Sequence, residues 1–415
     1  MGVLAVKAGS LYAYDAHLSA GVGVEHTNNS TKVSENGPSD LKQQANLDLG
    51  LSRKGESVDA DIGYKVGYID YSRDTQRDST EISGNLNVDY RQVENLLVWH
   101  LKNSVRNVKR DTALVNTSDN RENRSISSIS PEFTFRLSSV DTLQLTPSYT
   151  DVSYETSNND SERIGTVMDL SHSLSSVDSL GLSLNYNKVD FSAAGADYDY
   201  YRAVVFYRAQ LARINYSVSV GYNETDRDSF SKTISGNYFS AAANYSHGYS
   251  SFGLSFLQEL TDTSLGNNND SITGVSPGQD SSTVDIYRRR SLQMDYTTRA
   301  LCSTCSVNLY LSVEDKNYEG TTPDNVESTA GVRLGYELTR LSAISLDASY
   351  TNTAYDGRVT PSDYDEQHYR INWRREVFRD LNLNIYVGYE ERTSSEPTRE
   401  YDELVGGLAC NYRFL

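Results

Sequence analysis

Residues 179–192 read SLGLSLNYNKVDFS, and apolar and polar side chains alternate along them. The apolar set is Leu180, Leu182, Leu184 and Tyr186, and between its members stand Gly181, Ser183, Asn185 and Asn187. Successive side chains of a β-strand point to opposite faces, so a period of two predicts a strand with one apolar and one polar face. The stretch therefore needs apolar surroundings on one side and polar surroundings on the other.

The same alternation recurs along the whole chain, for example in residues 58–68 (VDADIGYKVGY), 213–223 (RINYSVSVGYN) and 381–389 (LNLNIYVGY). About twenty segments fit the template of a half-buried strand. They are longer than the five or six residues usual in soluble sheets, and they match the roughly ten residues that a tilted strand needs to cross a bilayer. We predict an all-β fold: a closed antiparallel transmembrane β-barrel of about 20 strands (18–22), with apolar side chains facing lipid and polar ones facing the lumen.

A soluble solenoid or stacked sandwich is the alternative, but solenoids show a fixed repeat period and this sequence has none. Link lengths favour the barrel. Short links such as QVEN (92–95) alternate with long polar ones such as NNSTKVSENGPSD (28–40). Outer-membrane barrels have short periplasmic turns and long extracellular loops, so we expect the long links outside and, with an even strand number, both termini in the periplasm. Tyrosines late in the strands are expected at the lipid–water boundary, among them Tyr64, Tyr186 and Tyr350.

Composition excludes several classes. The chain has 415 residues, 37% of them hydrophobic, with 31 tyrosines and a formal charge of −18. Disordered chains are poor in aromatic residues, and nucleic-acid binders need a basic stripe, so neither class fits. Residues 1–13 are interpreted as a signal-peptide remnant or disordered start, and residues 14–415 as one barrel domain. We expect an outer-membrane protein of a Gram-negative bacterium that contacts lipid and lipopolysaccharide and binds no nucleic acid.

Because side chains alternate between the two faces of a strand, the odd or even position of a residue, here called its parity, predicts which polar side chains line the lumen. The pore-lining candidates are Asp59, Asp61, Lys65, Lys102, Arg333, Arg370 and Arg374. Opposite charges on neighbouring strands stiffen a barrel wall, and rings of charge tune the selectivity of a pore. Of these residues, the three arginines are the candidate site for an anionic sugar or a carboxylate.

Cys302 and Cys305 form a C-x-x-C in a predicted turn. A disulfide in an oxidising compartment is favoured over redox exchange, which needs a thiolate activated at a helix N-terminus. The histidines have no metal-ligand spacing, and we find no catalytic constellation. We therefore expect neither an enzyme nor a bound cofactor. Tyr412 and Phe414 close the chain on an aromatic pattern that resembles the signal read by the barrel-assembly machinery.

Several segments together resemble a known family: LSAGVGVEHTNN (18–29), VDADIGYKVGYIDYSRD (58–74), residues 123–155 and the C-terminal YRF. They are similar to the outer-membrane β-barrels associated with PEP-CTERM/exosortase exopolysaccharide clusters. That resemblance implies a role in exporting or anchoring an exopolysaccharide, with a periplasmic export partner. A second likeness is to the porin sheath of porin–cytochrome conduits, which implies a plugging lipoprotein or cytochrome. A third hypothesis, a passive diffusion porin for small solutes, needs neither partner.

Overall fold

The computed structural model describes residues 14–111, 113–192, 197–227, 232–263, 285–320, 322–356 and 363–415. Two short 3₁₀ turns, η1 (Ser118–Asn120) and η2 (Pro397–Arg399), accompany the strands. In this part of the chain, no helix is long and apolar enough to cross a membrane. The strands are β1 (Tyr14–Thr27), β2 (Asp40–Arg53), β3 (Val58–Tyr71), β4 (Ser79–Val93), β5 (Leu97–Lys109), β6 (Arg121–Arg136), β7 (Asp141–Tyr154), β8 (Ser161–Ser173), β9 (Asp178–Phe191), β10 (Tyr198–Gln210), β11 (Ile214–Arg227), β12 (Lys232–His247), β13 (Ser250–Asp262), β14 (Ile286–Thr298), β15 (Cys305–Tyr318), β16 (Asn325–Thr339), β17 (Ser342–Tyr355), β18 (Tyr364–Phe378), β19 (Leu381–Ser394) and β20 (Tyr401–Arg413).

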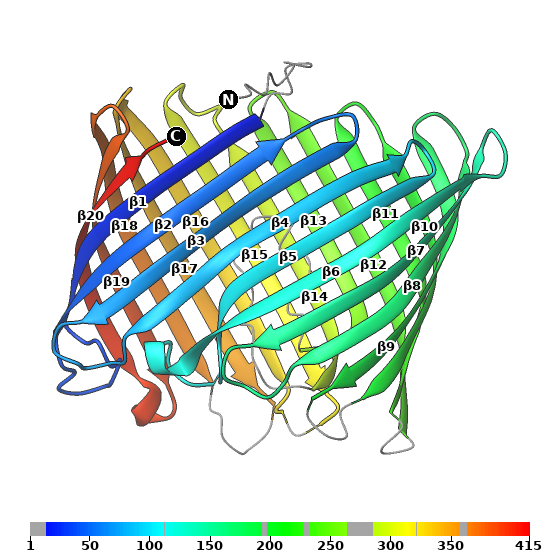
Figure 1. The fold of residues 1–415 in the computed structure, drawn as a ribbon. Helices are drawn as coiled ribbons and strands as arrows, with labels where there is room; N and C mark the ends of the chain where they lie inside the picture. The colour runs from blue at the N-terminus through cyan, green and yellow to red at the C-terminus, as the bar shows by residue number, and fades with distance from the viewer. Residues whose placement is uncertain are drawn as a thin grey trace, which may run out of the picture.

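All of these strands belong to one closed antiparallel sheet. Each pairs with its neighbours in sequence, and β1 pairs with β20 from Ser19 opposite Arg413 to Thr27 opposite Val405. The strands run obliquely around the barrel (Figure 1). The predicted closed barrel of about 20 strands is confirmed, as a 20-stranded sheet. Residues 1–13, the predicted remnant or disordered start, lie outside the described residues.

The outer surface is the apolar face of the strands. Leu180, Leu182 and Leu184 of β9 are 42%, 39% and 37% exposed, whereas Ser183 between them is buried. Exposed leucine, valine and isoleucine at alternate positions recur around the barrel. Such a belt around a closed sheet is stable only in lipid, because it would be an apolar patch far larger than a soluble surface carries. The protein is an outer-membrane β-barrel.

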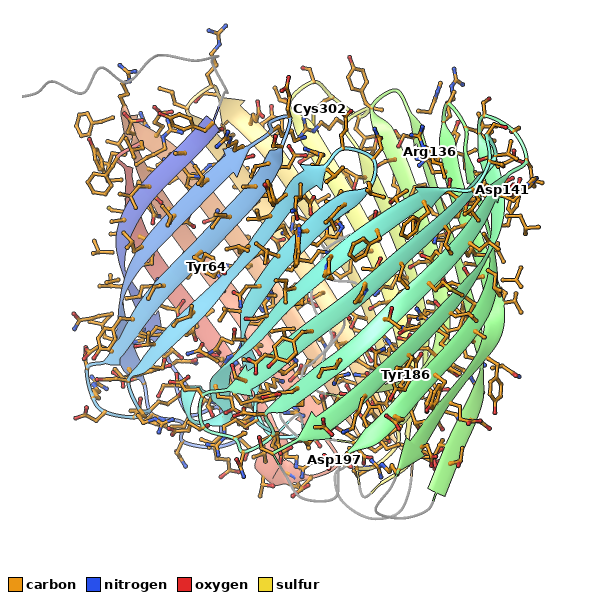
Figure 2. All side chains as sticks on the ribbon, turned by 45° about the vertical axis from the view of Figure 1, so that its right-hand side comes forward. Tyr64, Arg136, Asp141, Tyr186, Asp197 and Cys302 are labelled. Atoms are coloured by element: carbon orange, nitrogen blue, oxygen red, sulfur yellow. A yellow bond between two sulfur atoms is a disulfide. The ribbon has the colours of Figure 1, made fainter. Side chains whose placement is uncertain are left out.

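The two ends of the barrel differ. The start of β1, the C-terminus and the short links, such as Gly248–Tyr249 between β12 and β13, lie at one end, here named the turn end; the long links lie at the other, the loop end (Figure 1). Tyr186 lies toward the loop end, where its hydroxyl donates to Asp199, but Tyr64 lies about midway between the ends (Figure 2). The boundary position predicted for Tyr64 is therefore wrong. Its hydroxyl instead donates to Asn103 on the wall at 2.5 Å.

Gly181 of the opening stretch has a packing role that differs from the expected wet lumen. The ring of Phe206, which points inward from β10, covers it so closely that a Cβ would lie 2.3 Å from Phe206 Cζ. Phe206 is 2% exposed and carries the Arg208 guanidinium 4.1 Å from its ring centroid. The inner wall here is thus aromatic as well as polar, because a glycine on one strand makes room for a ring from the next.

Candidate functional site

The turn-end half of the lumen is lined by rows of charged side chains. The seven pore-lining candidates all stand at positions that alternate with the apolar outer face, on β3, β5, β16 and β18. Asp59 bonds to Arg91, and Lys65 stands opposite Asp48 in the register. Asp61 and Lys102 both stand opposite Asn87 of β4, which separates their strands.

The arginine candidates do not form an isolated cationic patch. Arg333 Nε lies 2.5 Å from Asp347, and Asp347 stands opposite Arg370 on the next strand. Arg370 also lies 3.9 Å from the centroid of the Tyr386 ring. Arg374 is nearer the turn end, in a small recess beside Cys305. The carboxylate between two of the arginines gives this wall charges of both signs.

The loop-end half is shaped by strands β13 and β14, which leave the wall. β13 pairs with β12 only from Ser250 to Gln258, although β12 continues back to Lys232 along β11. Beyond Gln258, β13 stays paired with β14 up to Asp262 opposite Ile286. Side chains bridge the gap between the described parts of these strands: Gln258 donates to the Asn237 carbonyl at 3.2 Å and Arg288 to that of Ser235 at 3.4 Å. We name residues 259–262 and 286–290 the inward hairpin end.

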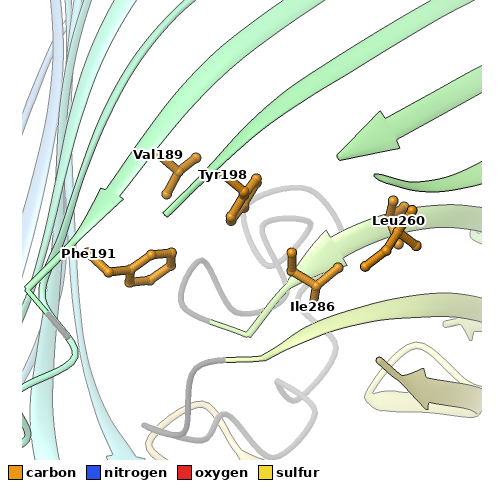
Figure 3. Close-up of a cluster of buried hydrophobic side chains, with 6 residues drawn as sticks. Val189, Phe191, Tyr198, Leu260 and Ile286 are labelled. Atoms are coloured by element: carbon orange, nitrogen blue, oxygen red, sulfur yellow. The ribbon is translucent and has the colours of Figure 1, made fainter. Parts of the chain in front are cut away.

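Hydrophobic packing holds this hairpin end against the inner wall. Leu260 and Ile286, each 1% exposed, pack with Val189, Phe191 and Ile234 inside the barrel (Figure 3). The Asn223 side chain of β11 contacts the Leu260 backbone, so β13 crosses the lumen face of its former neighbours. Leu260 and Ile286 stand on the strand face that elsewhere in β13 and β14 is turned to lipid. Because the hairpin turns inward, they instead pack inside the barrel.

A buried ion pair fixes the same element. Arg163 of β8 donates from Nη2 to both carboxylate oxygens of Asp262, at 2.8 and 3.0 Å. The Tyr198 hydroxyl donates to the same carboxylate. Arg163 and Asp262 side chains are 8% and 2% exposed, so the pair is shielded from water. Charge-assisted hydrogen bonds of this kind are among the stronger ones in proteins.

A second inward element is the link between β5 and β6. The carbonyl of Ala113 in this link accepts from Arg392 Nη2 of β19 at 3.2 Å, and Ser118 bonds to the Tyr71 hydroxyl at 2.9 Å. The Arg392 side chain is fully buried, with its guanidinium 3.5 Å from the Tyr364 ring centroid. The link therefore contacts β3 and β19, and together with the inward hairpin end it narrows the lumen at the loop end.

Lys32, in the link between β1 and β2, ties a third segment to the wall. Its Nζ lies 2.8 Å from Glu390 and 3.3 Å from Glu403, and the Tyr401 hydroxyl donates to Glu390 at 2.6 Å. Burial alone would lower the pKa of Lys32, but the two carboxylates outweigh it and the pKa is raised. The lysine is therefore held charged, as the bridge requires.

Beside the inward hairpin end lies a cavity of about 670 Å³, within the usual range of a small-molecule pocket. Its walls come from β8, β9, β10, β12, β13, β14 and β15 and carry tyrosines, amides and hydroxyls as well as charges; among the lining residues are Asn185, Tyr200, Arg202, Tyr238, Glu259, Arg289, Gln293 and Asp295. Sequence reasoning missed this site: Asn185 and Asn187 were expected to face the lumen, but no lining residue was among the pore-lining candidates. The signal in the sequence was the break in alternation at Gln258 and Asp262, which are polar residues on the face of β13 that carries Phe252, Leu254 and Phe256.

The remaining predicted residues lie outside the lumen's centre. Cys302 and Cys305 are bonded to each other in the turn between β14 and β15. The rings of Tyr412 and Phe414 meet edge-on at 4.9 Å on the outer face at the end of β20. His17 and His172 each pair with one carboxylate, Asp48 at 2.8 Å and Asp141 at 2.7 Å, and His100 lies 2.6 Å from Asp89 and 3.6 Å from Glu132. In the described ranges, no group of three potential metal ligands comes together.

No model of a known protein family matches the sequence, and no curated protein does either. Several solved structures are similar over nearly the whole chain. The siderophore receptor PirA from Pseudomonas aeruginosa has 11% sequence identity and a TM-score of 0.46, covering 98% of this chain and 81% of that one. The FrpB iron transporter from Neisseria meningitidis (F5-1 variant) has 10% identity and a TM-score of 0.49, covering 96% and 83%. OccK2 (OpdF) from Pseudomonas aeruginosa has 11% identity and a TM-score of 0.40, covering 97% and 98%.

Proposed function

We propose that the protein is a channel for small hydrophilic solutes, with its narrowest part at the loop end. The observation that carries the proposal is the inward hairpin end, held by Arg163 and Asp262 across the lumen face of four intervening strands. A barrel of about twenty strands would otherwise enclose a wide water-filled path. The hairpin and the β5–β6 link reduce that path to a polar passage lined by charged, amide and tyrosine side chains.

The turn-end half of the lumen supports the same function. It carries charges of both signs on neighbouring strands, as in the row Arg333, Asp347 and Arg370, although Asp59 stands opposite Asp89. Charges of both signs keep the wall hydrated without a strong field of one sign. We therefore propose weak discrimination between small cations and anions in this half, and selection of solutes near the loop-end constriction.

Export of an exopolysaccharide, which the sequence resemblance implies, is the second candidate. The cavity favours it, because tyrosine faces such as Tyr200 and Tyr238 beside amides such as Asn185 suit the apolar and hydroxyl-bearing surfaces of sugar rings. A polymer would need both inward elements to move aside. A plugged sheath has the least support, since the inward hairpin end occupies lumen that a plugging protein would need.

The test is the purified barrel in a planar bilayer and in liposomes loaded with sugars of increasing size. A small-solute channel conducts on its own, with modest ion selectivity, and excludes sugars above a sharp size limit. An exporter passes oligosaccharides of any length once it opens. A silent barrel that co-purifies with a haem protein would replace the proposal with the sheath.

The bilayer and liposome measurements are made with the barrel inserted in either orientation, so that the loop end faces one side or the other. We propose that the loop end faces the cell exterior and the turn end the periplasm, as link lengths in outer-membrane barrels suggest. Lipopolysaccharide and the barrel-assembly machinery are the partners this orientation implies, the latter through Tyr412 and Phe414.

A further inference from the structure

Residues 113–120 of the β5–β6 link, here named the flap, are closed by hydrogen bonds of their own. The Asn120 side chain donates to the carbonyls of Asp111 at 2.8 Å and Val115 at 3.2 Å, and its oxygen accepts from the Asp111 N–H at 3.0 Å. The Asn120 backbone N–H donates to the Thr117 carbonyl at 3.1 Å. A compact loop whose ends are joined by its own side chain and backbone keeps its shape when it moves.

The flap is joined to the barrel wall by a small set of hydrogen bonds on two sides. Toward β3, the Ser118 N–H donates to the Gln76 side chain at 2.7 Å, and the Ser118 hydroxyl bonds to that of Tyr71 at 2.9 Å. Toward β19, the Ala113 carbonyl accepts from Arg392 Nη2 at 3.2 Å. The two sets of contacts hold the flap across the lumen at the loop end.

The flap lacks the packing that fixes the inward hairpin end. Leu114 is 45% exposed, and no flap residue belongs to either buried hydrophobic cluster of the described barrel, whereas Leu260 and Ile286 of the hairpin end are buried in one of them. Arg77 lies 3.9 Å from Asp119 of the flap, but both side chains are more than half exposed, so this pair contributes little. Of the two inward elements, the flap is therefore the more weakly held.

The closed position of the flap also leaves buried charges poorly satisfied. The Arg392 side chain is fully buried, yet its Nε and Nη1 have no hydrogen-bond acceptor within the described ranges, because Glu366 Oε1 is 3.7 Å from Nε. Lys109, at the base of the link, is 8% exposed. Glu366 and Glu327 attract it, but no hydrogen bond or ion pair joins it to any residue that the structure describes. Buried donors without acceptors are costly, and water satisfies them once the flap moves away.

We propose that the flap is the gate of the channel. It swings away from the wall as one unit about its base, between Lys109 and Arg121, while the inward hairpin end stays in place. The inference rests on the proposed channel, because it names the element that opens the loop-end constriction. A gate of this kind gives the barrel a low and a high conductance level, and the contacts of Ser118 and Ala113 set the ratio of the times spent in them.

Single-channel recording in a planar bilayer tests the contact with β3. Tyr71→Phe removes the hydroxyl that bonds to Ser118 and keeps the ring, so we expect the ratio of open to closed time to rise about fivefold, as for one lost hydrogen bond. The matched control is Tyr207→Phe, whose hydroxyl donates to Asp178 at 3.0 Å near the turn end and should leave the ratio unchanged. An unchanged ratio in Tyr71→Phe would overturn the proposal.

Cross-linking tests which of the two inward elements moves. In a Cys410→Ser background, Tyr71→Cys and Ser118→Cys are joined by a short bifunctional methanethiosulfonate, and the barrel should stay at its low conductance level until a reductant releases the link. Joining Asn223→Cys to Leu260→Cys ties the hairpin end to β11 and should leave the transitions intact. The single-cysteine variants treated with the same reagent are the controls. Transitions that persist with the flap linked, or that stop when the hairpin end alone is linked, would contradict the assignment.

Hydrogen exchange of the purified barrel follows the flap without a current. The Ser118 N–H bonds to the wall and should exchange whenever the gate opens, whereas the Asn120 N–H bonds within the flap and should be better protected. A barrel that shows this difference but never conducts refutes the channel alone. A conducting barrel in which both amides are equally protected refutes the gate alone, because the flap then does not move as one unit.

Discussion

Arg163 and Asp262 form a buried ion pair although four strands, β9 to β12, lie between the strands that carry them. Along the wall, such a distance is too large for any side chain to span. The contact exists because β13 leaves β12 after Gln258 and carries Asp262 across the inner wall to β8. The pair therefore exists only because the hairpin end turns inward, and a substitution in the pair tests what the inward hairpin end does.

Replacing Asp262 with Asn is expected to loosen the hairpin end and raise single-channel conductance. Breaking a buried pair leaves the other charge uncompensated and costs about 3–5 kcal/mol. The inward hairpin end is then held by the packing of Leu260 and Ile286 alone. The control is Arg290→Met on β14, whose partner Asp315 lies 3.5 Å away and whose side chain is 58% exposed, so the pair contributes little. Identical currents from the Asp262 variant and the unmodified barrel would show that the hairpin does not limit conduction.

The alternation of apolar and polar residues was enough to predict the barrel, because every strand must present apolar side chains to the lipid. A one-residue slip would expose a whole polar face to hydrocarbon, so the period of two survives along most of the chain. The same rule fails at Leu260, whose parity matches the exposed Leu254 but which lies inside. The parity of a residue tells on which face of its own strand the side chain lies. It does not tell where that strand leaves the sheet.

The alternation of the two strand faces was predictable from the sequence, but the contacts of the polar side chains were not. Arg333, Arg370 and Arg374 stand at positions that alternate with the exposed apolar side chains, yet which charges meet depends on the register between strands, which places Asp347 opposite both Arg333 and Arg370. The cavity beside Arg202 of β10 depends further on β13 and β14, which fold inward although β11 and β12 lie between them and β10 in the chain. Such long-range contacts leave no local pattern in a single sequence.

A single added charge is expected to destabilise the barrel on the lipid face of a strand but not on its lumen face. Val66→Arg, on an outer side chain that is 41% exposed, is expected to lower the free energy of unfolding in lipid vesicles by roughly 2–4 kcal/mol. Gly63→Arg is the matched lumen variant on the same strand, because nothing lies within 4 Å of a Cβ there. It should unfold at nearly the same urea concentration as the unmodified barrel. Equal losses in the two variants would contradict the assigned faces.

Lys32 is expected to keep the β1–β2 link closed to protease. Lys32→Met leaves Glu390 and Glu403 close together without their cation, so cleavage after the exposed Glu35 by a glutamate-specific protease should become at least several-fold faster. The control is Lys54→Met, in a turn-end link.

The pH dependence of that protection follows from the raised pKa of Lys32. A raised pKa stabilises the folded link fully below the unfolded value of about 10.4, and the stabilisation fades only as pH rises through the native value. Resistance of the unmodified protein should therefore be constant from roughly pH 6 to 9. A steady loss of resistance across that interval would mean that another group controls the link.

The orientation of the barrel is expected to place Cys302 and Cys305 in the periplasm, where their bond closes the β14–β15 turn. In a Cys410→Ser background, Glu35→Cys at the loop end should react with a membrane-impermeant maleimide on intact cells. Ser139→Cys, in the turn-end link between β6 and β7, should react only after the outer membrane is permeabilised. Cys302 and Cys305 should stay unlabelled in both cases until a reductant is added, and mass spectrometry of the trapped protein should then find the bridge. Labelling of Ser139→Cys on intact cells would invert the orientation, and free thiols without reductant would remove the disulfide.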